Sequence, residues 1–334
     1  FLSPRLRPLT HWNLMTQEAK LHCSAAPGIF STFTKDVRWS PDGTCILTCD
    51  DENTLKLFEL PCEPEPLEGT WQPVLQAKEG ETIYDYCWYP WMTSSDPTSC
   101  CFLSTSRDHP LHLFDAFSGQ LRASYRAFDH LDEITAALSC CFSPDGQRIV
   151  GGYNRCLRVF DVAVPGKPVL TIQTSATKRS REGQRGLISA LTASPPAFEG
   201  SGSVVAAGSY QGSIFIYDAR TGHAEMEVTS GSSSSSSSSV GGVTQLQFSR
   251  DGRFLFSGSR KGSTEEQSHV VCWDPRSSAS CLASYPRTAR THQRIGFDLD
   301  PLGRWLATGS DDGQVLVYDL ASGERVENLF GSSE

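Results

Sequence analysis

The sequence lacks the motifs that most enzyme classes and zinc domains require. None of its 12 cysteines forms a CxxC pair, and no HxH or HExxH arrangement occurs among its eight histidines. GxSxG and P-loop motifs are absent as well. No run of 18 apolar residues is present, so the sequence encodes no membrane-spanning helix. These absences argue against an enzyme, a metal protein or a membrane protein, and we expect no cofactor.

Charge and cysteine usage narrow the class further. The net charge of −9 over 334 residues argues against indiscriminate coating of nucleic acid, although it leaves room for a local basic site. The first residue is Phe1, so we expect the natural N-terminus to precede this sequence. Cysteines inside expected strands favour reduced core thiols in a cytosolic or nuclear protein. They are Cys45, Cys87, Cys141, Cys156 and Cys272.

An internal repeat predicts the fold. Each copy reads as a strand, a Ser-Pro-Asp-Gly-like turn, an apolar strand, a tight loop and an alternating strand with an aromatic-acidic ending. A glycine supplies the positive φ of the turn, and the closing aromatic should fill the gap between successive blades. The aromatics are spaced by 45 to 57 residues: Phe58, Phe114, Phe160, Tyr217, Trp273 and Tyr318. We therefore predict an all-β WD40 β-propeller with six recognisable four-stranded blades.

The repeat also sets the expected boundaries. The propeller should cover residues 31–330, with blades ending near 60, 115, 161, 218, 274 and 319. Residues 1–30 are an N-terminal extension that is weakly ordered or packs on the propeller, and residues 231–242 form a Ser/Gly-rich disordered loop. Seven blades are the commonest closure and an open ring exposes strand edges. We expect either that a seventh blade is missing or incomplete, or that six close differently.

Charges separate between the two rims that the repeat predicts. Loops before the first strand and after the second should share one rim, here the upper rim, and the remaining turns should form the lower rim. The upper-rim loops Thr174–Gly186 and Arg287–Ile295 are basic, and Tyr153 and Asn154 directly precede Arg155. On the lower rim, acidic residues gather without a basic neighbour: Glu59, Glu63, Glu65 and Glu68.

Arginines beside aromatic rings suit single-stranded RNA, whose splayed bases stack on both. The same charges are also expected in loops that are merely solvated or that bind an acidic peptide. Arg260 could instead form a structural ion pair with an acidic residue of the next blade. The predicted RNA-binding residues are Arg107, Arg155, Tyr210, Arg260, Lys261 and Arg294. A catalytic-looking group at Asp129, His130, Asp132 and Glu133 is better explained as a loop that hydrogen-bonds its own backbone.

Five stretches carry a family resemblance: Glu81–Tyr89 (ETIYDYCWY), Asp115–Ala136, Arg294–Gly303 (RIGFDLDPLG), Gly43–Pro61 and Phe256–Gly262. They resemble the telomerase Cajal body protein family of WD40 proteins, also called WRAP proteins. The resemblance covers about residues 30–323 and extends into loops that generic WD40 repeats do not share.

The resemblance implies an RNA-binding scaffold that recognises the CAB box of H/ACA small Cajal-body RNAs and of telomerase RNA. It would direct these RNAs to Cajal bodies and support telomerase assembly and telomere maintenance. The implied location is the nucleus, at Cajal bodies and telomeres, with some of the protein in the cytoplasm. Implied partners are CAB-box RNAs, H/ACA proteins including dyskerin, coilin, and the cytosolic chaperonin during folding, with no membrane. The alternative is a protein–protein scaffold without direct RNA recognition, for example one that recruits DNA-repair factors.

Overall fold

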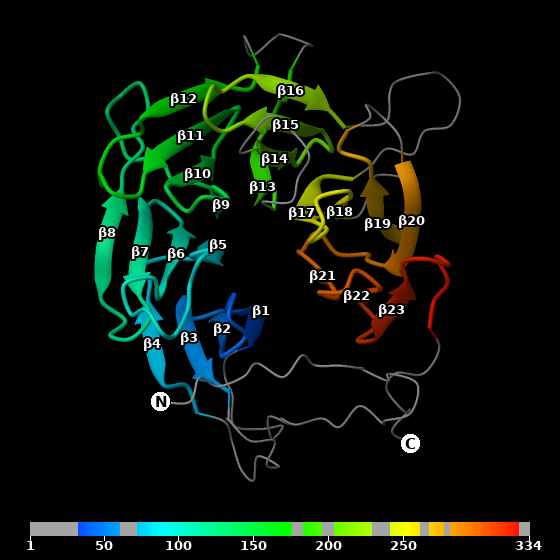
Figure 1. Ribbon diagram of the computed structural model, residues 1–334. Coiled ribbons are helices and arrows are strands. Elements are labelled where there is room, and N and C mark those ends of the chain that lie inside the picture. Colours follow the sequence, from blue (N-terminus) through cyan, green and yellow to red (C-terminus); the bar gives the residue numbers. More distant parts are fainter. Residues whose placement is uncertain are drawn as a thin grey trace.

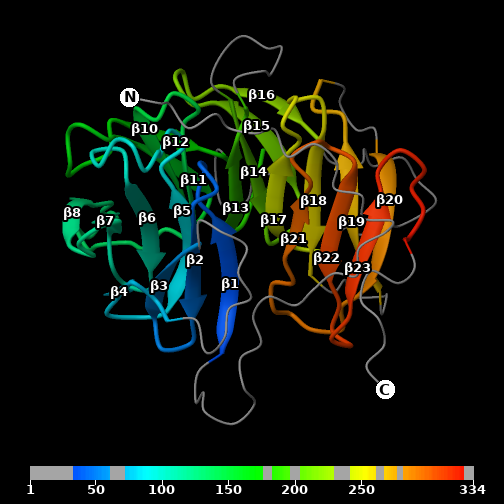
Figure 2. The ribbon, with the colours of Figure 1, turned by 60° about the horizontal axis from the view of Figure 1, so that its bottom comes forward.

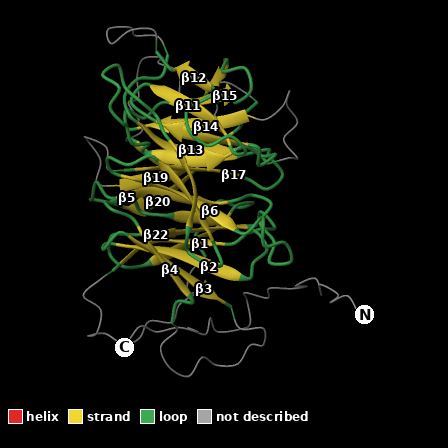
Figure 3. Ribbon diagram, turned by 90° about the vertical axis from the view of Figure 1, so that its left-hand side faces the viewer, coloured by secondary structure: helices red, strands yellow, loops and turns green. Residues whose placement is uncertain are grey.

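The computed structural model describes residues 33–60, 72–175, 183–195, 204–228, 241–260, 267–276 and 281–326. Within these ranges all regular elements are β-strands (Figure 3). They form five four-stranded antiparallel sheets and a sixth sheet with three described strands, which stand around a ring (Figures 1 and 2). The predicted all-β propeller with six blades is thus confirmed.

Each sheet runs from an inner strand near the centre of the ring to an outer strand on its circumference (Figure 1). The inner strands are β1 (Thr34–Trp39), β5 (Ile83–Trp88), β9 (Ser139–Phe142), β13 (Ile188–Ala193), β17 (Val243–Phe248) and β21 (Phe297–Leu299). The second strands are β2 (Cys45–Asp50), β6 (Cys101–Ser106), β10 (Arg148–Gly152), β14 (Val204–Ser209), β18 (Leu255–Ser259) and β22 (Trp305–Gly309). The third strands are β3 (Thr54–Glu59), β7 (Leu111–Asp115), β11 (Cys156–Asp161), β15 (Ile214–Asp218), β19 (Gln267–Trp273) and β23 (Val315–Asp319). The outer strands are β4 (Leu75–Lys78), β8 (Leu121–Tyr125), β12 (Leu170–Gln173), β16 (Ala224–Glu227) and β20 (Cys281–Thr288).

The aromatic-acidic strands are the third strands of their sheets rather than the last. The first sheet therefore ends at Lys78 and not near residue 60, and the fifth ends at Thr288 and not near 274. The outer strands escaped prediction because they are largely exposed and carry little apolar alternation, as in β16 with its sequence AEME. The predicted extension over residues 1–30 and the eight-serine run lie outside the described residues.

Five of the six closing aromatics pack between neighbouring blades, as predicted, whereas Phe58 of the first blade is half-buried and belongs to none of the buried clusters of the described residues. Phe114 belongs to the buried cluster between blades 1 and 2, and Phe160 to the cluster between blades 2 and 3. Tyr217, Trp273 and Tyr318 occupy the same place in the next three clusters. These clusters are the core of the molecule, so the fold is stabilised blade against blade.

In five of the six pairs the acidic residue caps the turn that follows it. Asp115 Oδ1 accepts hydrogen bonds from the backbone amides of Phe117 (2.9 Å) and Ser118 (2.8 Å). The corresponding carboxylates do the same in four other blades: Asp161, Asp218, Asp274 and Asp319. A short acidic side chain that binds nearby amides stabilises a tight turn, which explains why the repeat ends on an acid.

Serine and glycine fix the Ser-Pro-Asp-Gly turns on the lower rim. Ser40 Oγ accepts from the amides of Thr44 (3.1 Å) and Cys45 (3.0 Å) and donates to Asp42 (2.7 Å). Gly43 follows with φ +71°, a left-handed conformation that favours glycine. The turn thereby returns the chain from β1 to β2 within five residues.

Polar side chains of the inner strands reach the backbone of the next inner strand. Asp85 Oδ2 accepts from the amide of Cys140 (3.0 Å), and Ser139 Oγ donates to the carbonyl of Ile188 (2.9 Å). Gln245 Nε2 donates to the carbonyl of Phe297 (2.7 Å). Such bonds satisfy buried backbone groups between blades and fix their relative positions.

The described cysteines are free thiols, as predicted. Cys45, Cys141, Cys156 and Cys272 are buried, and Cys87 is half-buried. Burial raises the pKa of the Cys272 thiol to about 12, so this side chain behaves as a neutral core residue.

Candidate nucleic-acid interface

The upper rim consists of tight turns between the second and third strands, together with loops between blades. One residue adopts a left-handed backbone in each of the five turns that are fully described: these include Asn53 in blade 1, Asp108 in blade 2 and Arg155 in blade 3, with φ of 64°, 57° and 59°. Gly212 and Gly313 hold the equivalent place in blades 4 and 6, with φ of 86° and 82°. Asparagine, aspartate and glycine tolerate this conformation far better than arginine does. Arg155 is therefore the unusual member of the series.

Contacts with the neighbouring loop hold Arg155 in place. Its amide donates to the carbonyl of Gly186 (2.9 Å), its carbonyl accepts from the amide of Thr174 (3.0 Å), and its Nε donates to Ser175 Oγ (3.0 Å). The side chain is half-buried. The other guanidinium nitrogens have no hydrogen bond among the described residues, so the surroundings fix the backbone while part of the cation faces solvent.

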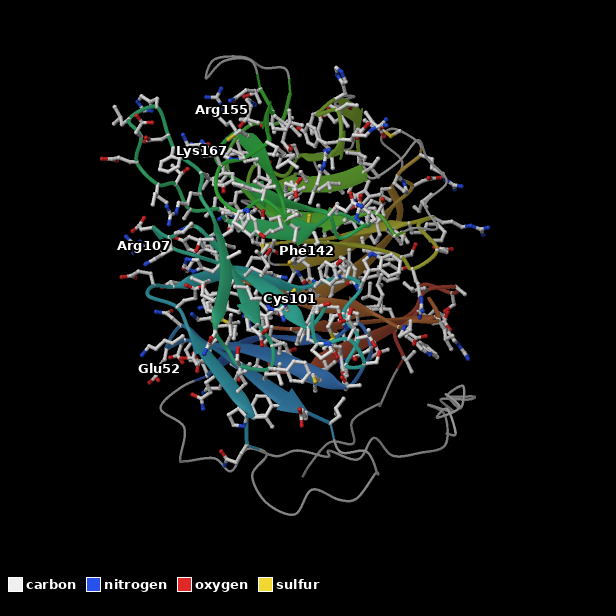
Figure 4. The ribbon with its side chains drawn as sticks, turned by 60° about the vertical axis from the view of Figure 1, so that its left-hand side comes forward. Glu52, Cys101, Arg107, Phe142, Arg155 and Lys167 are labelled. Carbon is white, nitrogen blue, oxygen red and sulfur yellow. The ribbon has the colours of Figure 1, made fainter. Side chains whose placement is uncertain are left out.

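Arg107 occupies the neighbouring turn of blade 2 and is more open. Its side chain is 61% exposed, and its Nε lies 3.4 Å from Asp108 Oδ2. Figure 4 shows Arg107, Arg155 and Glu52 toward the left of the ring, with Cys101 and Phe142 nearer its middle. The three belong to equivalent turns of successive blades, so they lie on one rim.

Tyr210 and Arg260 form one unit across two blades. The guanidinium carbon of Arg260 lies 4.8 Å from the ring centroid of Tyr210, and Tyr210 is 37% exposed. The backbone of Gly242 passes between their turns, because an added Cβ there would lie 2.4 Å from the Tyr210 carbonyl oxygen and 2.8 Å from Arg260 Nε. Within the described residues Arg260 has no acidic partner, so the predicted alternative of a structural ion pair is not what is observed. The pair presents a stacked cation and ring on the rim.

Arg294 does not join the other arginines in an open patch. Its guanidinium lies 3.5 Å from Asp85 and 3.9 Å from Asp36, and its side chain is 31% exposed. It therefore links the loop before blade 6 with the inner strands of blades 1 and 2. Lys261, the sixth predicted residue, lies outside the described residues.

Three details of the charge prediction need correction. Arg287 is buried in β20, where burial lowers its pKa to about 10, and it donates to the carbonyl of Ile295 and to Thr308 Oγ1 (both 2.8 Å). Tyr153 is also buried, beneath the guanidinium of Arg158 at 4.9 Å, and offers no free ring. The upper rim is also acidic in blades 1 and 6, through Asp51, Glu52, Asp311 and Asp312. Among the described turns between second and third strands, those of blades 1 and 6 are thus acidic.

A buried polar cluster that the sequence analysis missed supports the turn of Arg107. His112 Nδ1 lies 3.0 Å and 3.1 Å from the two carboxylate oxygens of Glu79, which also accept from Ser104 and Ser106. Burial alone would raise the pKa of Glu79, but hydrogen bonds from His112 and Ser104 outweigh it and lower that pKa. No spacing signal links Glu79 to His112, because the residues lie in different blades.

The residues around Asp129 form a loop that hydrogen-bonds its own backbone, as predicted. Asp129 Oδ1 accepts from the amides of Leu131 (2.8 Å) and Glu133 (3.0 Å), and the Asp129 amide donates to the Glu133 carbonyl (2.9 Å). These backbone hydrogen bonds, with that from Glu133 foremost, lower the pKa of the Asp129 carboxyl. The carboxylate is thereby engaged by its own turn.

The rest of the described surface adds no cluster of three or more metal-ligating side chains. Over the same ranges no helix has the length and apolar character needed to cross a bilayer. What the rim offers is arginine and tyrosine side chains on turns held by a rigid ring. Side chains of these two types can bind ligands by stacking and by charge.

Both the ring and its repeat define a WD40 β-propeller. The family model "WD domain, G-beta repeat" matches residues 31–59, 125–161, 232–274 and 280–319. Within that class, the chain is 41% identical over 319 residues to "Telomerase Cajal body protein 1" of Homo sapiens, covering 93% of this chain and 54% of that protein. It is 35% identical over 304 residues to the Drosophila melanogaster homolog, covering 86% and 51%.

The chain belongs to the telomerase Cajal body protein family of WD40-repeat proteins. The resemblance stated from the sequence is therefore confirmed. A further relative is "Guanine nucleotide-binding protein negative regulator 1" of Schizosaccharomyces pombe, 30% identical over 292 residues, 84% of this chain and 69% of that protein. The chain spans about half the length of the telomerase Cajal body proteins that it matches.

Proposed function

We propose that the chain is an RNA-binding scaffold that recognises the CAB box of telomerase RNA and of H/ACA small Cajal-body RNAs through its upper rim. The observation that carries the proposal is the exposed pair of Tyr210 and Arg260, stacked at 4.8 Å between two blades. A splayed base gains about 1–3 kcal/mol by stacking on such a group. The names of the telomerase Cajal body relatives support the same reading.

Arg155 and Arg107 extend this surface along the neighbouring turns. Arg155 keeps a left-handed backbone that an arginine adopts at a cost, and such conformations concentrate at binding sites. Arg107 is exposed enough to reach a phosphate. We assign base stacking to the Tyr210–Arg260 pair and backbone charge neutralisation to Arg155 and Arg107. Arg294 and Lys261 complete the proposed set.

The proposal extends to the cellular context. The scaffold would carry its RNAs to Cajal bodies in the nucleus and to telomeres, in company with H/ACA proteins including dyskerin and with coilin, after folding assisted by the cytosolic chaperonin. It would act through binding and not through catalysis, like other WD40 scaffolds.

Binding of a CAB-box stem–loop tests the proposal. We expect Arg260→Glu to weaken binding about tenfold or more and to reduce its dependence on salt. Arg253→Glu is the matched control, because Arg253 lies in the same blade on the lower rim with a 67% exposed side chain. Equal affinity of both variants and the wild type would refute the site.

A second candidate is a protein-binding scaffold without RNA recognition, which the sequence analysis left open, including the recruitment of DNA-repair factors. The relative named a guanine nucleotide-binding protein negative regulator favours it, since that name describes action on another protein. Partners that stay bound after ribonuclease treatment, together with no affinity for the stem–loop, would support this candidate and contradict the first.

A further inference from the structure

The connection between β5 and β6 departs from the repeat. Four other blades join their first two strands by turns of five or six residues: Ser40–Thr44, Ser143–Gln147, Ser249–Phe254 and Asp300–Arg304. Blade 2 instead uses residues Tyr89–Cys100, here called the lower-rim insertion. The insertion lies opposite the proposed RNA rim, because turns between first and second strands point away from turns between second and third strands.

The insertion is anchored to the blades on both sides. Ser94 donates from its amide (2.8 Å) and its hydroxyl (2.7 Å) to Asp42 in the turn of blade 1. Trp91 Nε1 donates to the carbonyl of Pro144 in the turn of blade 3 (2.9 Å). Met92 is buried in the core between blades 1 and 2. A long segment with these contacts is a fixed structure, and it spans the lower rim of three blades.

This fixed segment holds an aromatic side chain open to solvent. Trp91 is 56% exposed although its indole N–H is satisfied. Phe117, which is 60% exposed, lies in the adjoining turn after Asp115. Arg122 connects this turn to the insertion, because it donates hydrogen bonds to Asp115 and to the carbonyls of Thr98 (2.7 Å) and Pro97 (3.0 Å). Rigid exposed tryptophans are typical anchors of interfaces.

The surroundings of Trp91 select the charge of a ligand. Asp145 follows Pro144, whose carbonyl accepts from the indole, Asp96 lies within the insertion, and Asp42 accepts from the amide of Ser94. Within the described residues none of these three carboxylates forms an ion pair. Hydrogen bonding by Thr98 lowers the pKa of Asp96, and for Asp42 burial is outweighed by bonds from Ser94, Ser40 and Thr44 that lower its pKa. Asp42 and Asp96 are therefore negative at neutral pH.

We propose that the lower-rim insertion docks an arginine-rich segment of a partner protein, with a guanidinium stacked on Trp91 and the charge balanced by Asp42, Asp96 and Asp145. A planar guanidinium stacks on an indole and pairs with carboxylates at the same time, which suits arginine better than lysine. The negative surroundings repel a nucleic-acid backbone. This site is separate from the proposed RNA rim and does not depend on it.

Fluorescence anisotropy with a short labelled peptide of alternating arginine and glycine tests the proposal on the full chain. Trp91→Ala should weaken binding about 5- to 30-fold, the range of a cation–π contact. Trp39→Ala is the matched control, because Trp39 is 54% exposed on β1, and it should bind like the wild type. The corresponding lysine peptide should bind more weakly, and a glutamate peptide should not bind.

Further variants separate recognition from folding. Trp91→Phe keeps an aromatic ring and should bind the peptide with intermediate affinity. Asp145→Asn keeps the hydrogen-bond acceptor of its turn but removes the charge, so peptide binding should weaken and lose salt dependence. Arg260→Glu should leave peptide binding unchanged, which distinguishes this site from the RNA rim. The proposal is overturned if folded Trp91→Phe and Asp145→Asn bind like the wild type, if Trp39→Ala loses as much affinity, or if Trp91→Ala impairs binding of RNA instead.

Discussion

Replacing His112 by alanine should lower the free energy of unfolding, because the buried carboxylate of Glu79 then loses its main partner. Glu79 is 2% exposed in its side chain, and His112 binds both of its oxygens. Breaking a buried pair by removing one partner costs about 3–5 kcal/mol. Because Ser104 and Ser106 still donate to Glu79, we expect His112→Ala to lower the free energy of unfolding by about 3 kcal/mol.

A double-mutant cycle attributes that loss to the pair. Glu79→Gln removes the charge but keeps a polar side chain of the same shape, so it should cost only about 1–2 kcal/mol. The variant with both substitutions should then be more stable than the sum of the single losses predicts, by about 1–3 kcal/mol. His223→Ala is the control, because His223 is exposed and should change stability by less than about 0.5 kcal/mol.

The pH dependence of unfolding gives the same pair a second signature. The pKa of Glu79 is lowered in the folded protein, because hydrogen bonds from His112 and Ser104 outweigh the effect of burial. Its contribution to stability is therefore present above the unfolded pKa of about 4 and disappears as pH falls through the lower folded value. Without His112 burial dominates, so the loss in His112→Ala should shrink toward acid pH. Urea unfolding followed by tryptophan fluorescence measures all these quantities, and additive, pH-independent losses would refute the reasoning.

Two further predictions concern the turns and the centre of the ring. Gly146→Ala should destabilise the fold by about 2 kcal/mol, which is more than Gly43→Ala. Both glycines have positive φ, but only at Gly146 would an added Cβ meet another group, Tyr89 Oη at 2.7 Å. Equal melting temperatures of the two variants would contradict this expectation. Arg294→Ala should lower the melting temperature, and the difference from wild type should decrease at high salt, because the lost ion pairs with Asp85 and Asp36 are partly exposed. A salt-independent difference in thermal unfolding would show that the ion pairs contribute little.

Sequence reasoning predicted those parts of the fold that depend on local pattern. The Ser-Pro-Asp-Gly turns and the alternating third strands repeat in sequence, and Phe114, Phe160 and Trp273 lie between blades as expected. The outer strands were missed because their sequences carry no pattern of their own. Strands such as β4 and β16 are positioned by antiparallel pairing with the third strand of their blade. The predicted blade ends near residues 60 and 274 coincide with the ends of the third strands β3 and β19, and an outer strand follows each of them.

The repeat predicted where the proposed site residues lie along the chain but not their surroundings. Arg155, Tyr210 and Arg260 follow the second strands of their blades, as the repeat indicated. Burial cannot be inferred from charge, however, so Arg287 and Tyr153 were counted on the rim although both are buried. The ion pairs of Arg294 join residues more than 200 positions apart in sequence, and such contacts follow only from the arrangement of the blades around the ring.

The most direct test of the central claim is ultraviolet crosslinking of a CAB-box stem–loop to the chain, with crosslinked peptides mapped by mass spectrometry. The proposed function predicts crosslinks at Tyr210 and in the turns of Arg155 and Arg107, and their loss in Arg260→Glu but not in Arg253→Glu. Crosslinks confined to the lower rim, or equally strong in both variants, would contradict it.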